Sequence, residues 1–148
     1  MGSEMCIRDR IRLLMEDPGS VLNIAKGGYI GLLRRLVGAK GADVDATDKD
    51  GGTAVMYASN GGHLECVKYL VGEKGAGVDA ANKDGRTAVM LASVGGHLEC
   101  VKYLVGEKGA GVDAADENGM TAVMLASYGG HLECVKYLMG EKLSLIHI

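Results

Sequence analysis

The stretch "GGHLECVKYL" occurs three times without a change, at residues 61–70, 95–104 and 129–138. The histidines within it, His63, His97 and His131, lie 34 residues apart. Self-similarity at a fixed period of this length is typical of architectures in which identical units stack on one another. The stretch therefore predicts a repeat solenoid and raises the question of what His-x-x-Cys does in each unit.

The sequence around this stretch divides into four units. Residues 51–84 and 85–118 differ at six positions, and residues 119–142 differ from 85–108 at three. A shift back by one period gives a degenerate first repeat at residues 17–50, where "GGYIGLLRRL" aligns with "GGHLECVKYL". We therefore expect a first repeat (17–50), two full repeats (51–84 and 85–118) and a truncated repeat (119–142), after an unassigned segment (11–16).

Each unit predicts two short helices. In the third unit, Thr87 is a suitable N-cap for a helix that ends near Ser93, Gly95 and Gly96 turn the chain, and residues 97–105 form a second helix. Apolar residues on the second helix recur at i, i+3 and i+7, which leaves a stripe that a neighbouring unit must cover. Helices of this length are marginal alone, so stacking has to supply the stability.

The segment between helix pairs predicts a hairpin. It contains Asp84-Gly85, with equivalents at 50–51 and 118–119, a pair that favours tight turns because glycine supplies positive φ. Tetratricopeptide repeats share the period, but the tryptophan, phenylalanine and helix-ending proline of their pattern are absent here. We expect an all-α dominated repeat solenoid of helix-turn-helix units joined by β-hairpin loops.

These features resemble the ankyrin repeat over residues 17–142. Residues 85–92, GRTAVMLA, are similar to the family pattern Gly-x-Thr-Pro-Leu-His-x-Ala, and residues 96–99 and 41–46, GHLE and GADVDA, match two further parts of it. The resemblance implies stacked helix pairs whose hairpin tips and inner helices form a concave surface for partners.

The sequence departs from the family pattern in two ways. The proline of the family pattern is replaced by alanine, at Ala54, Ala88 and Ala122. The histidine of the pattern is replaced by methionine, at Met56, Met90 and Met124. The family's hydrogen bond between threonine and histidine therefore cannot form as usual. One extra residue lengthens each unit to 34, near Gly72, Gly106 and Gly140. We expect it to lengthen the loop there.

His97 and Cys100 allow two interpretations. Residues at i and i+3 share a helix face and both can ligate zinc. However, zinc needs four ligands at about 2.0–2.3 Å, whereas packed helices lie about 8–10 Å apart. The favoured interpretation is a helix-start hydrogen bond from His97 and a small buried side chain at Cys100. The residues assigned to structure are Thr53, Thr87, Thr121, Gly62, His63, Gly96, His97, Gly130 and His131.

Catalytic and cofactor sites are not predicted. Ser93, His97 and Asp113 have counterparts in neighbouring units, and a repeated lattice position explains this better than several active sites would. The stretch GEKGAG at 72–77 lacks the Gly-Lys-Ser/Thr ending of a phosphate loop. We expect no cofactor, no bound metal and no enzyme activity.

Positions where near-identical units disagree are the candidates for partner binding, because hairpin tips and inner helices face the concave side in the proteins that this chain resembles. Drift at exposed positions is the alternative. The predicted partner-binding residues are Lys49, Asp50, Gly52, Tyr57, Asn60, Lys83, Asp84, Arg86, Val94, Glu117, Asn118, Met120 and Tyr128.

Composition narrows the class of partner. The net charge of −3 and a sequence pI near 5.8 offer no basic face for nucleic acid. No apolar run reaches the roughly 18 residues of a membrane span. Three cysteines inside the repeats fit no intramolecular disulfide framework. We expect a protein partner and a cytoplasmic protein, with the nucleus as the alternative.

Both ends read as foreign sequence. The DNA ATG TGT ATA AGA GAC AG followed by a purine encodes residues 5–10, and CTG TCT CTT ATA CAC ATC, which contains its reverse complement, encodes residues 143–148. This DNA resembles a sequencing-library transposase adapter, whose upstream continuation would encode residues 1–4. We expect residues 1–10 and 143–148 to be translated adapter and the natural protein to continue beyond both.

The sequence thus predicts a scaffold for protein–protein interaction without catalysis of its own. The alternative is a regulatory or targeting region of a larger enzyme, such as a kinase, whose catalytic domain lies outside these residues. A self-contained enzyme is disfavoured because no site for one is visible.

Overall fold

A computed structural model describes the backbone of residues 20–39 and 41–146 and the side chains of residues 21–39 and 41–140. The predictions for residues 1–10 and 11–16, for the start of the first repeat and for the last two residues lie outside this part of the chain.

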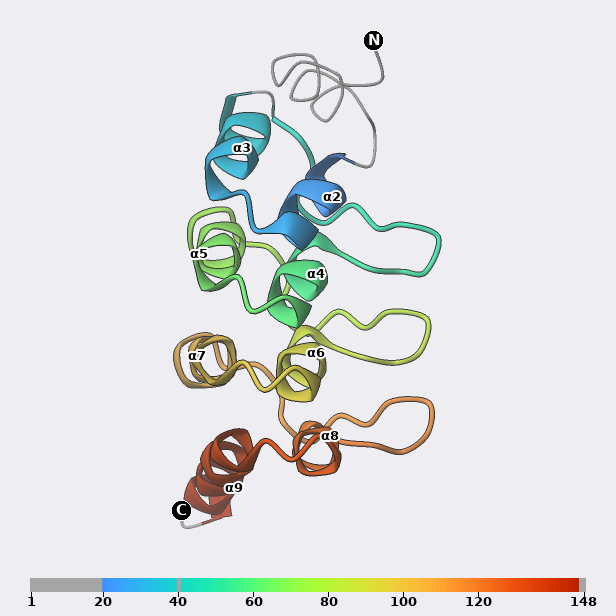
Figure 1. Ribbon diagram of the computed structural model, residues 1–148, viewed down its shortest axis with the longest axis vertical. Helices are drawn as coiled ribbons and strands as arrows, with labels where there is room; N and C mark the ends of the chain where they lie inside the picture. Colours follow the sequence, from blue (N-terminus) through green and yellow to red (C-terminus); the bar gives the residue numbers. More distant parts are fainter. Residues whose placement is uncertain (1–19, 40, 147–148) are drawn as a thin grey trace, which may run out of the picture.

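The helices form two parallel columns (Figure 1). The inner column consists of α2 (Ser20–Gly27), α4 (Ala54–Asn60), α6 (Ala88–Val94) and α8 (Ala122–Tyr128). The outer column begins with α3 (Ile30–Arg34) and continues through α5 (Leu64–Val67), α7 (Leu98–Val101) and α9 (Leu132–Ile146). Each inner helix packs against the inner helix of the next unit. The predicted repeat solenoid is confirmed.

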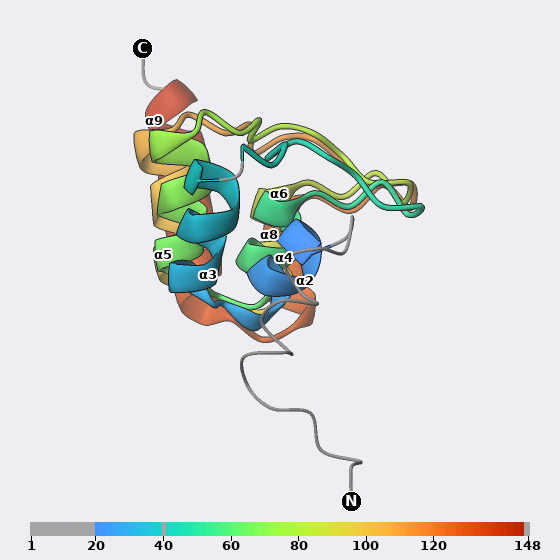
Figure 2. The same ribbon diagram turned by 90° about the horizontal axis from the view of Figure 1, so that it is seen from above.

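Long loops leave the outer column, cross over the inner helices and project to one side, so that each unit has the outline of an L seen from above (Figure 2). Within the described residues these loops contain no assigned strand, whereas the sequence predicted β-hairpins. Backbone hydrogen bonds near the turn close each loop tip, such as those from Asn82 N to Arg86 O at 2.9 Å and from Gly85 N to Asn82 O at 3.0 Å. The arms are too short and glycine-rich for a ladder, so the loops are hairpins in shape only.

The inner helices α4, α6 and α8 each start after a threonine N-cap and are followed by a glycine pair. Thr87 has extended backbone, and its Oγ1 accepts a bond from Met90 N at 3.4 Å; Thr53 and Thr121 make the equivalent contact in their own units. Gly96 then adopts φ +72°, a conformation that costs little only for glycine. The chain therefore reverses in three residues and brings the outer helix beside the inner one.

The extra residue of the 34-residue unit is not in the loop, and the expectation of a longer loop is wrong. In the first three units it widens the outer helix instead, which continues as the π-helical turns η1 (Arg35–Ala39), η2 (Lys68–Glu73) and η3 (Lys102–Glu107), whereas the outer helix of the fourth unit, α9, is assigned as α-helix throughout. Lys108 N donates to Tyr103 O, five residues back, at 3.1 Å. Inserting one residue into an α-helix produces this wide turn, because the apolar side chains on either side then keep their places in the core.

The outer helix stops at a glycine in the first three units. Gly41, Gly75 and Gly109 have φ between +66° and +68°. Leu143 occupies this position in the fourth unit, and the backbone of α9 runs on as a helix to Ile146. Leucine adopts positive φ only with strain, so the replacement removes the signal that ends the helix.

The core lies between the two columns. It contains the apolar residue at the same place in successive outer helices, Leu70, Leu104 and Leu138, which are fully buried together with the inner-helix alanines such as Ala58 and Ala92. The first unit contributes Ile24 and Leu33. Every unit thus buries its stripe against the next, and no unit has a core of its own.

Candidate partner-binding surface

Histidine joins each unit to the one before it. His97 Nε2 lies 2.9 Å from Asn60 O, the last residue of α4, and His131 Nε2 lies 2.9 Å from Val94 O at the end of α6. Since the acceptor is a carbonyl, Nε2 carries the proton. His97 makes no side-chain bond to its own helix, so the expected helix-start hydrogen bond is wrong. The ring instead reaches the preceding unit, 37 residues back.

One glycine of its own unit and one glycine of the preceding unit lie against each histidine ring. A Cβ added at Gly95 would lie 2.5 Å from Nε2 of His97, and a Cβ added at Gly62, in the preceding unit, would lie 2.5 Å from its Nδ1. The imidazole is therefore held between two bare Cα atoms, one from each unit. This arrangement explains why Gly-Gly-His is unchanged in the three copies.

The loops are tied to one another as well. Asp45 Oδ1 accepts a bond from Gly77 N at 3.1 Å, and Asp79 Oδ1 accepts the equivalent bond from Gly111 N at 3.0 Å. Near the tips, Lys83 N donates to Asp50 O at 3.0 Å, with the same contact repeated one unit later. The first two junctions therefore each have one hydrogen bond at the helix end and two along the loop, which fix the spacing of the tips.

Each tip is folded by a residue that the sequence prediction missed. Asn82 Oδ1 accepts bonds from the amides of Asp84 and Arg86, both at 3.0 Å. Asp48 and Asp116 do the same in their units. An Asp or Asn two residues before an Asp-Gly or Asn-Gly pair is a recognised local signal for such a turn, so this role was readable from the sequence.

The predicted tip residues Lys49, Asp50, Lys83, Asp84, Glu117 and Asn118 are all exposed at the ends of the projecting loops. These loops lie one above another on one side of the molecule (Figure 1). The structure thus brings the six residues into three adjacent pairs, which change from Lys-Asp in two units to Glu-Asn in the third.

Two of the predicted residues, Gly52 and Tyr57, belong to an internal contact. The Tyr57 hydroxyl donates to Asp48 Oδ2, and the Lys26 ammonium lies 4.4 Å from the centre of the Tyr57 ring. Gly52 is buried beside this hydroxyl, which a Cβ at position 52 would approach to 2.7 Å. The hydrogen bond raises the pKa of Tyr57 to about 12 and lowers the pKa of Asp48 below its ordinary value. The differences at positions 52 and 57 between this unit and the next one, which has Arg86 and Leu91, are therefore coupled.

Arg86 is also engaged internally. Its Nε lies 3.3 Å from Oδ2 of Asp116, in the next loop tip, and the Asp116 side chain is almost completely buried. Bonds from the amide of Met120 and from that of Asn118, then the contact with Arg86, lower the pKa of the Asp116 carboxyl below its ordinary value, against the effect of desolvation. Arg86 thus fastens two neighbouring tips and is only partly available to a partner.

The remaining predicted positions are at the ends of the inner helices and at the last tip. Asn60 is exposed at the end of α4, Val94 is half-buried at the end of α6, and Tyr128 is 89% exposed at the end of α8. Met120, beside the third tip, is half-buried. The polar surface of the first tips therefore grades into an apolar one at the fourth unit.

Comparison with known families fits this geometry. A family model described as "Ankyrin repeats (3 copies)" matches residues 21–116 and again residues 74–146. The chain belongs to the ankyrin-repeat family. A search of curated proteins gives no significant match. Ankyrin repeats are generally protein–protein interaction modules and are typically non-catalytic.

Methionine replaces the first-helix histidine of the ankyrin pattern in this chain and takes a core position. Met56 and Met90 are almost completely buried, on the inner helices α4 and α6, which pack against the inner helices of the adjacent units. A flexible thioether fills such irregular space well. The threonine that would have bonded to that histidine keeps only its N-cap bond to the methionine amide.

The cysteines of these ankyrin repeats point into the core. Cys66, Cys100 and Cys134 are buried thiols without disulfides. Burial raises the pKa of each, and that of Cys100 to about 11, with a smaller contribution from the adjacent Glu99. Among the residues that the structure describes, no three histidine, cysteine or acidic side chains gather as a metal site would require.

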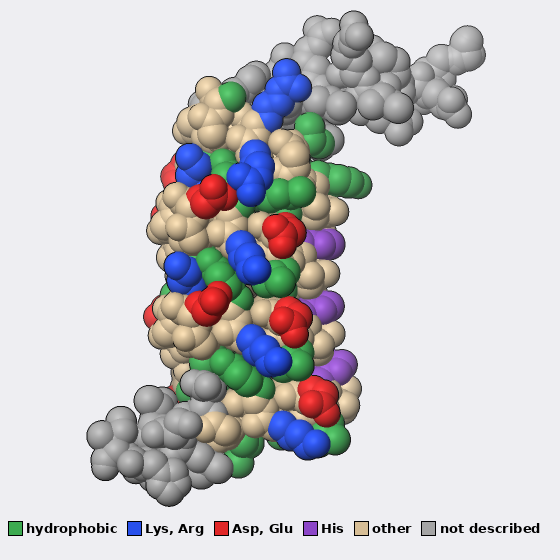
Figure 3. All heavy atoms as spheres, turned by 90° about the vertical axis from the view of Figure 1, so that its left-hand side faces the viewer, with side chains coloured by type: hydrophobic (Ala, Val, Ile, Leu, Met, Phe, Trp, Pro, Cys, Tyr) green, Lys and Arg blue, Asp and Glu red, His purple; other side chains and the backbone are tan. Residues whose placement is uncertain are grey.

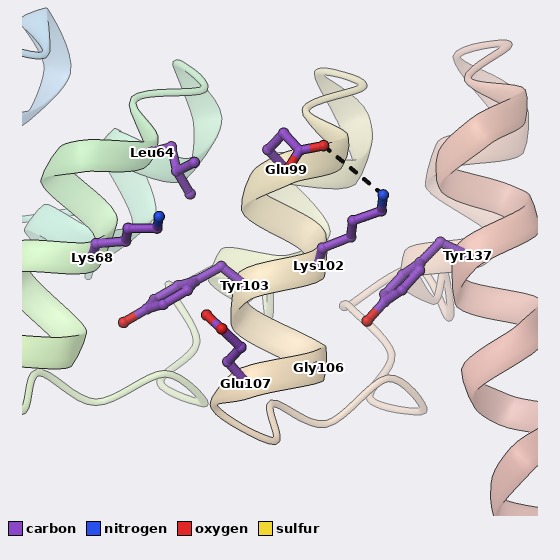
Figure 4. A pocket seen from close by; sticks show the side chains of 8 residues that line it. All are labelled: Leu64, Lys68, Glu99, Lys102, Tyr103, Gly106, Glu107 and Tyr137. Atoms are coloured by element: carbon purple, nitrogen blue, oxygen red, sulfur yellow. Dashed lines mark ion pairs between the residues drawn. The ribbon is translucent and has the colours of Figure 1, made fainter.

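The outer face of the ankyrin stack carries rows of lysine and glutamate in register, with the histidines along one edge (Figure 3). A shallow hollow lies across α7, where Lys102 pairs with Glu99 at 3.9 Å and the Tyr103 and Tyr137 rings flank the helix (Figure 4). The Lys-Glu pair recurs unchanged in the next unit at Lys136 and Glu133. This face therefore offers the same chemistry at successive levels.

No helix in the described part of the chain is both long enough and apolar enough to cross a membrane.

Proposed function

We propose that this ankyrin-repeat chain is a scaffold that binds a protein partner along the row of loop tips and the adjacent ends of the inner helices. The observation that carries the proposal is a contrast: the hydrogen bonds between units are the same at successive junctions, whereas the exposed residues of the loop tips vary. Histidine, glycine and aspartate fastenings repeat at successive junctions, while the exposed tip residues change from unit to unit.

Rigid spacing makes such a row suitable for recognition. Because the tips are fixed by bonds between units, a partner that binds several of them at once orders little new backbone, and the entropic cost of association is correspondingly low. The variable residues then set the specificity. The first two tips offer Lys-Asp pairs, and the last offers Glu117 and Asn118 next to Met120 and Tyr128, which favours a partner surface with a polar part and an apolar part.

Internal contacts narrow the set of predicted binding residues. Gly52, Tyr57 and Arg86 are engaged within the scaffold, so their differences between units have a structural reason. The proposed contacts are Lys49, Asp50, Asn60, Lys83, Asp84, Val94, Glu117, Asn118, Met120 and Tyr128. The prediction of a regulatory region in a larger enzyme concerns sequence beyond the described residues and stays a prediction.

Photo-crosslinking followed by direct binding tests the proposal. A benzophenone amino acid placed at Asn60 should capture the partner, whereas the same group at Glu133 on the outer face should not. The purified partner should then lose about tenfold or more in affinity for Tyr128→Ala or Lys83→Glu, as is common for residues at the centre of an interface. Lys102→Ala, on the outer face, is the matched control and should bind normally.

Two results would contradict this assignment. Equal affinity of the tip variants and the unaltered chain would indicate that the tip differences are drift. A loss of affinity confined to Lys102→Ala would place the partner on the outer face.

A further inference from the structure

The fourth unit leaves open the positions that every other described unit has covered. A Cβ added at Gly28, Gly62 or Gly96 would clash with the imidazole of the following unit, but one added at Gly130 meets no atom within 4 Å. Gly130 has the same backbone conformation, φ +76°, as its equivalents. The seat for a histidine ring is therefore formed at the end of the stack and stands open.

The hydrogen-bond acceptors of a junction are in place as well. Tyr128 O occupies the position of Asn60 O and Val94 O, which accept bonds from histidine Nε2 of the next unit. Asn118 O occupies the position of Asp50 O and Asp84 O, which accept bonds from Lys83 N and Glu117 N. The two carbonyls lie at the helix end and at the loop tip, the places where earlier junctions are fastened.

An apolar surface lies between these acceptors. Met124 is 48% exposed and Leu132 60% exposed, whereas Met56 and Met90, the equivalents of Met124, are at most 2% exposed. Met139, in the place of the buried Val71 and Val105, is 44% exposed. These positions are buried or half-buried wherever a further unit follows in the stack, so the open surface is continuous with an interface the molecule already uses.

We propose that the face formed by Asn118, Met124, Tyr128, Gly130, Leu132 and Met139 binds a further 34-residue unit of this type. The histidine of that unit donates its Nε2 proton to Tyr128 O, and an amide at its loop tip donates to Asn118 O. Its inner helix covers Met124, whose equivalents Met56 and Met90 are buried on inner helices that another inner helix follows.

A second copy of the chain is a poorer occupant for two reasons. Face-to-face pairing would oppose carbonyl acceptors with carbonyl acceptors, and a buried acceptor without a donor is costly. Head-to-tail stacking would present the first unit of the copy, which has Tyr29 in place of the histidine. Neither arrangement supplies the imidazole that fits Gly130.

The experiment extends the chain by one unit in register. Residues 143–148 are replaced by a copy of residues 109–142, which restores the glycine that ends the outer helix and adds a fourth Gly-Gly-His stretch. Hydrogen exchange is measured at the amides of α8 in the extended and original chains, and light scattering reports whether each is a monomer. Amide exchange in α8 should slow by about tenfold or more, since docking suppresses its local opening.

Two matched variants test the register. In the extended chain, replacing the histidine of the appended unit with alanine should make amide exchange in α8 faster again, part of the way toward its rate in the original chain. Gly130→Ala should destabilise the extended chain more than the original one, because only the extended chain places a ring against that position.

The outcomes decide the proposal. Unchanged exchange in α8 beside a folded appended unit would overturn it, as would equal exchange with and without the appended histidine, or a dimer of the original chain that protects α8 equally well. A copy of residues 75–108 is the second extension. If neither extension adds helical circular dichroism, the face does not accept a unit of this type and the proposal fails.

Discussion

The imidazole of His97 crosses from its own unit to the carbonyl oxygen of Asn60, 2.9 Å away, and rests against Gly62 of that same preceding unit. The contact joins the end of one inner helix to the start of the next outer helix. Because the solenoid has no core other than its junctions, the strength of this contact bears on the stability of the whole stack.

His97→Ala should lower the free energy of unfolding by about 1 kcal/mol or more, since it removes a hydrogen bond to a backbone carbonyl together with the packing of the ring. Urea denaturation followed by circular dichroism measures the change. Tyr29→Ala, at the equivalent position of the first unit but 57% exposed, should cost clearly less. Equal costs for the two variants would mean that the junction contact contributes nothing.

Gly62→Ala should be more damaging than Gly130→Ala. Both positions have positive φ, +74° and +76°, and a side chain in this conformation costs roughly 1–2 kcal/mol. Only at position 62 would the new Cβ also meet the imidazole of His97, at 2.5 Å. The difference between the two unfolding free energies therefore isolates the packing of the ring. Adding His97→Ala to Gly62→Ala should recover part of that difference.

Tyr57→Phe should cost about 1 kcal/mol at neutral pH, because it removes the bond to Asp48. The pKa of Tyr57 is raised from 10.0 to about 12 in the folded chain, so its contribution is complete below pH 10 and is lost as the pH rises toward 12. The pKa of Asp48 is lowered, so its contribution is present above 3.8 and is lost as the pH falls below that value.

The free energies of unfolding of the unaltered chain and of the Tyr57→Phe variant are measured across pH, and their difference reports the contact between Tyr57 and Asp48. This difference should be constant between about pH 3.8 and pH 10, and it should become smaller below and above that range. Tyr29→Phe, an exposed tyrosine, controls for general alkaline effects. A difference that stays constant up to pH 12 would contradict the contact.

Particular residues show how far the sequence predicts this structure. The period, the threonine N-caps and the glycine pairs are local signals, and they were enough to predict the helices and their stacking. The place of the extra residue was not predictable in the same way, because one inserted residue fits a longer loop or a π-helical turn equally well on paper. The structure places the extra residue in the helix: residues 102–107 form the π-helical turn, and Leu104 within it is fully buried.

The candidate surface shows the same division. Exposure of the tips followed from the turn signals, but the engagement of Tyr57 and Arg86 did not. Tyr57 meets Asp48 nine residues away, and Arg86 meets Asp116 thirty residues away in the next loop tip. Such contacts depend on how the loops lie over the helices, which no local pattern specifies. Comparing units by their differences alone therefore mixed structural pairs with free surface residues.

Thiol labelling at pH 8 should be slow in the folded protein. A pKa near 11 at Cys100, against the ordinary value of 9.0, reduces the thiolate by about a hundredfold, and thiolate is the reactive form. Cys6 lies outside the described residues, so the experiment uses the Cys6→Ser chain. Cys66, Cys100 and Cys134 should all react rapidly in urea. A repeat cysteine that reacts at the rate of free cysteine in the folded chain would indicate an accessible thiolate and would favour the metal-ligand interpretation again.

Arg86→Ala should lower stability, and the loss should depend on Asp116. Asp116→Asn is the informative partner variant, because Asn82 already accepts the same two amide bonds in the preceding unit, so the turn survives while the charge is lost. In the double variant, the effect of Arg86→Ala should therefore be smaller than in the single one. Urea midpoints of the four proteins give this coupling. Fully additive effects would mean that Arg86 is free, and only then would a binding defect of Arg86→Ala report directly on a partner contact.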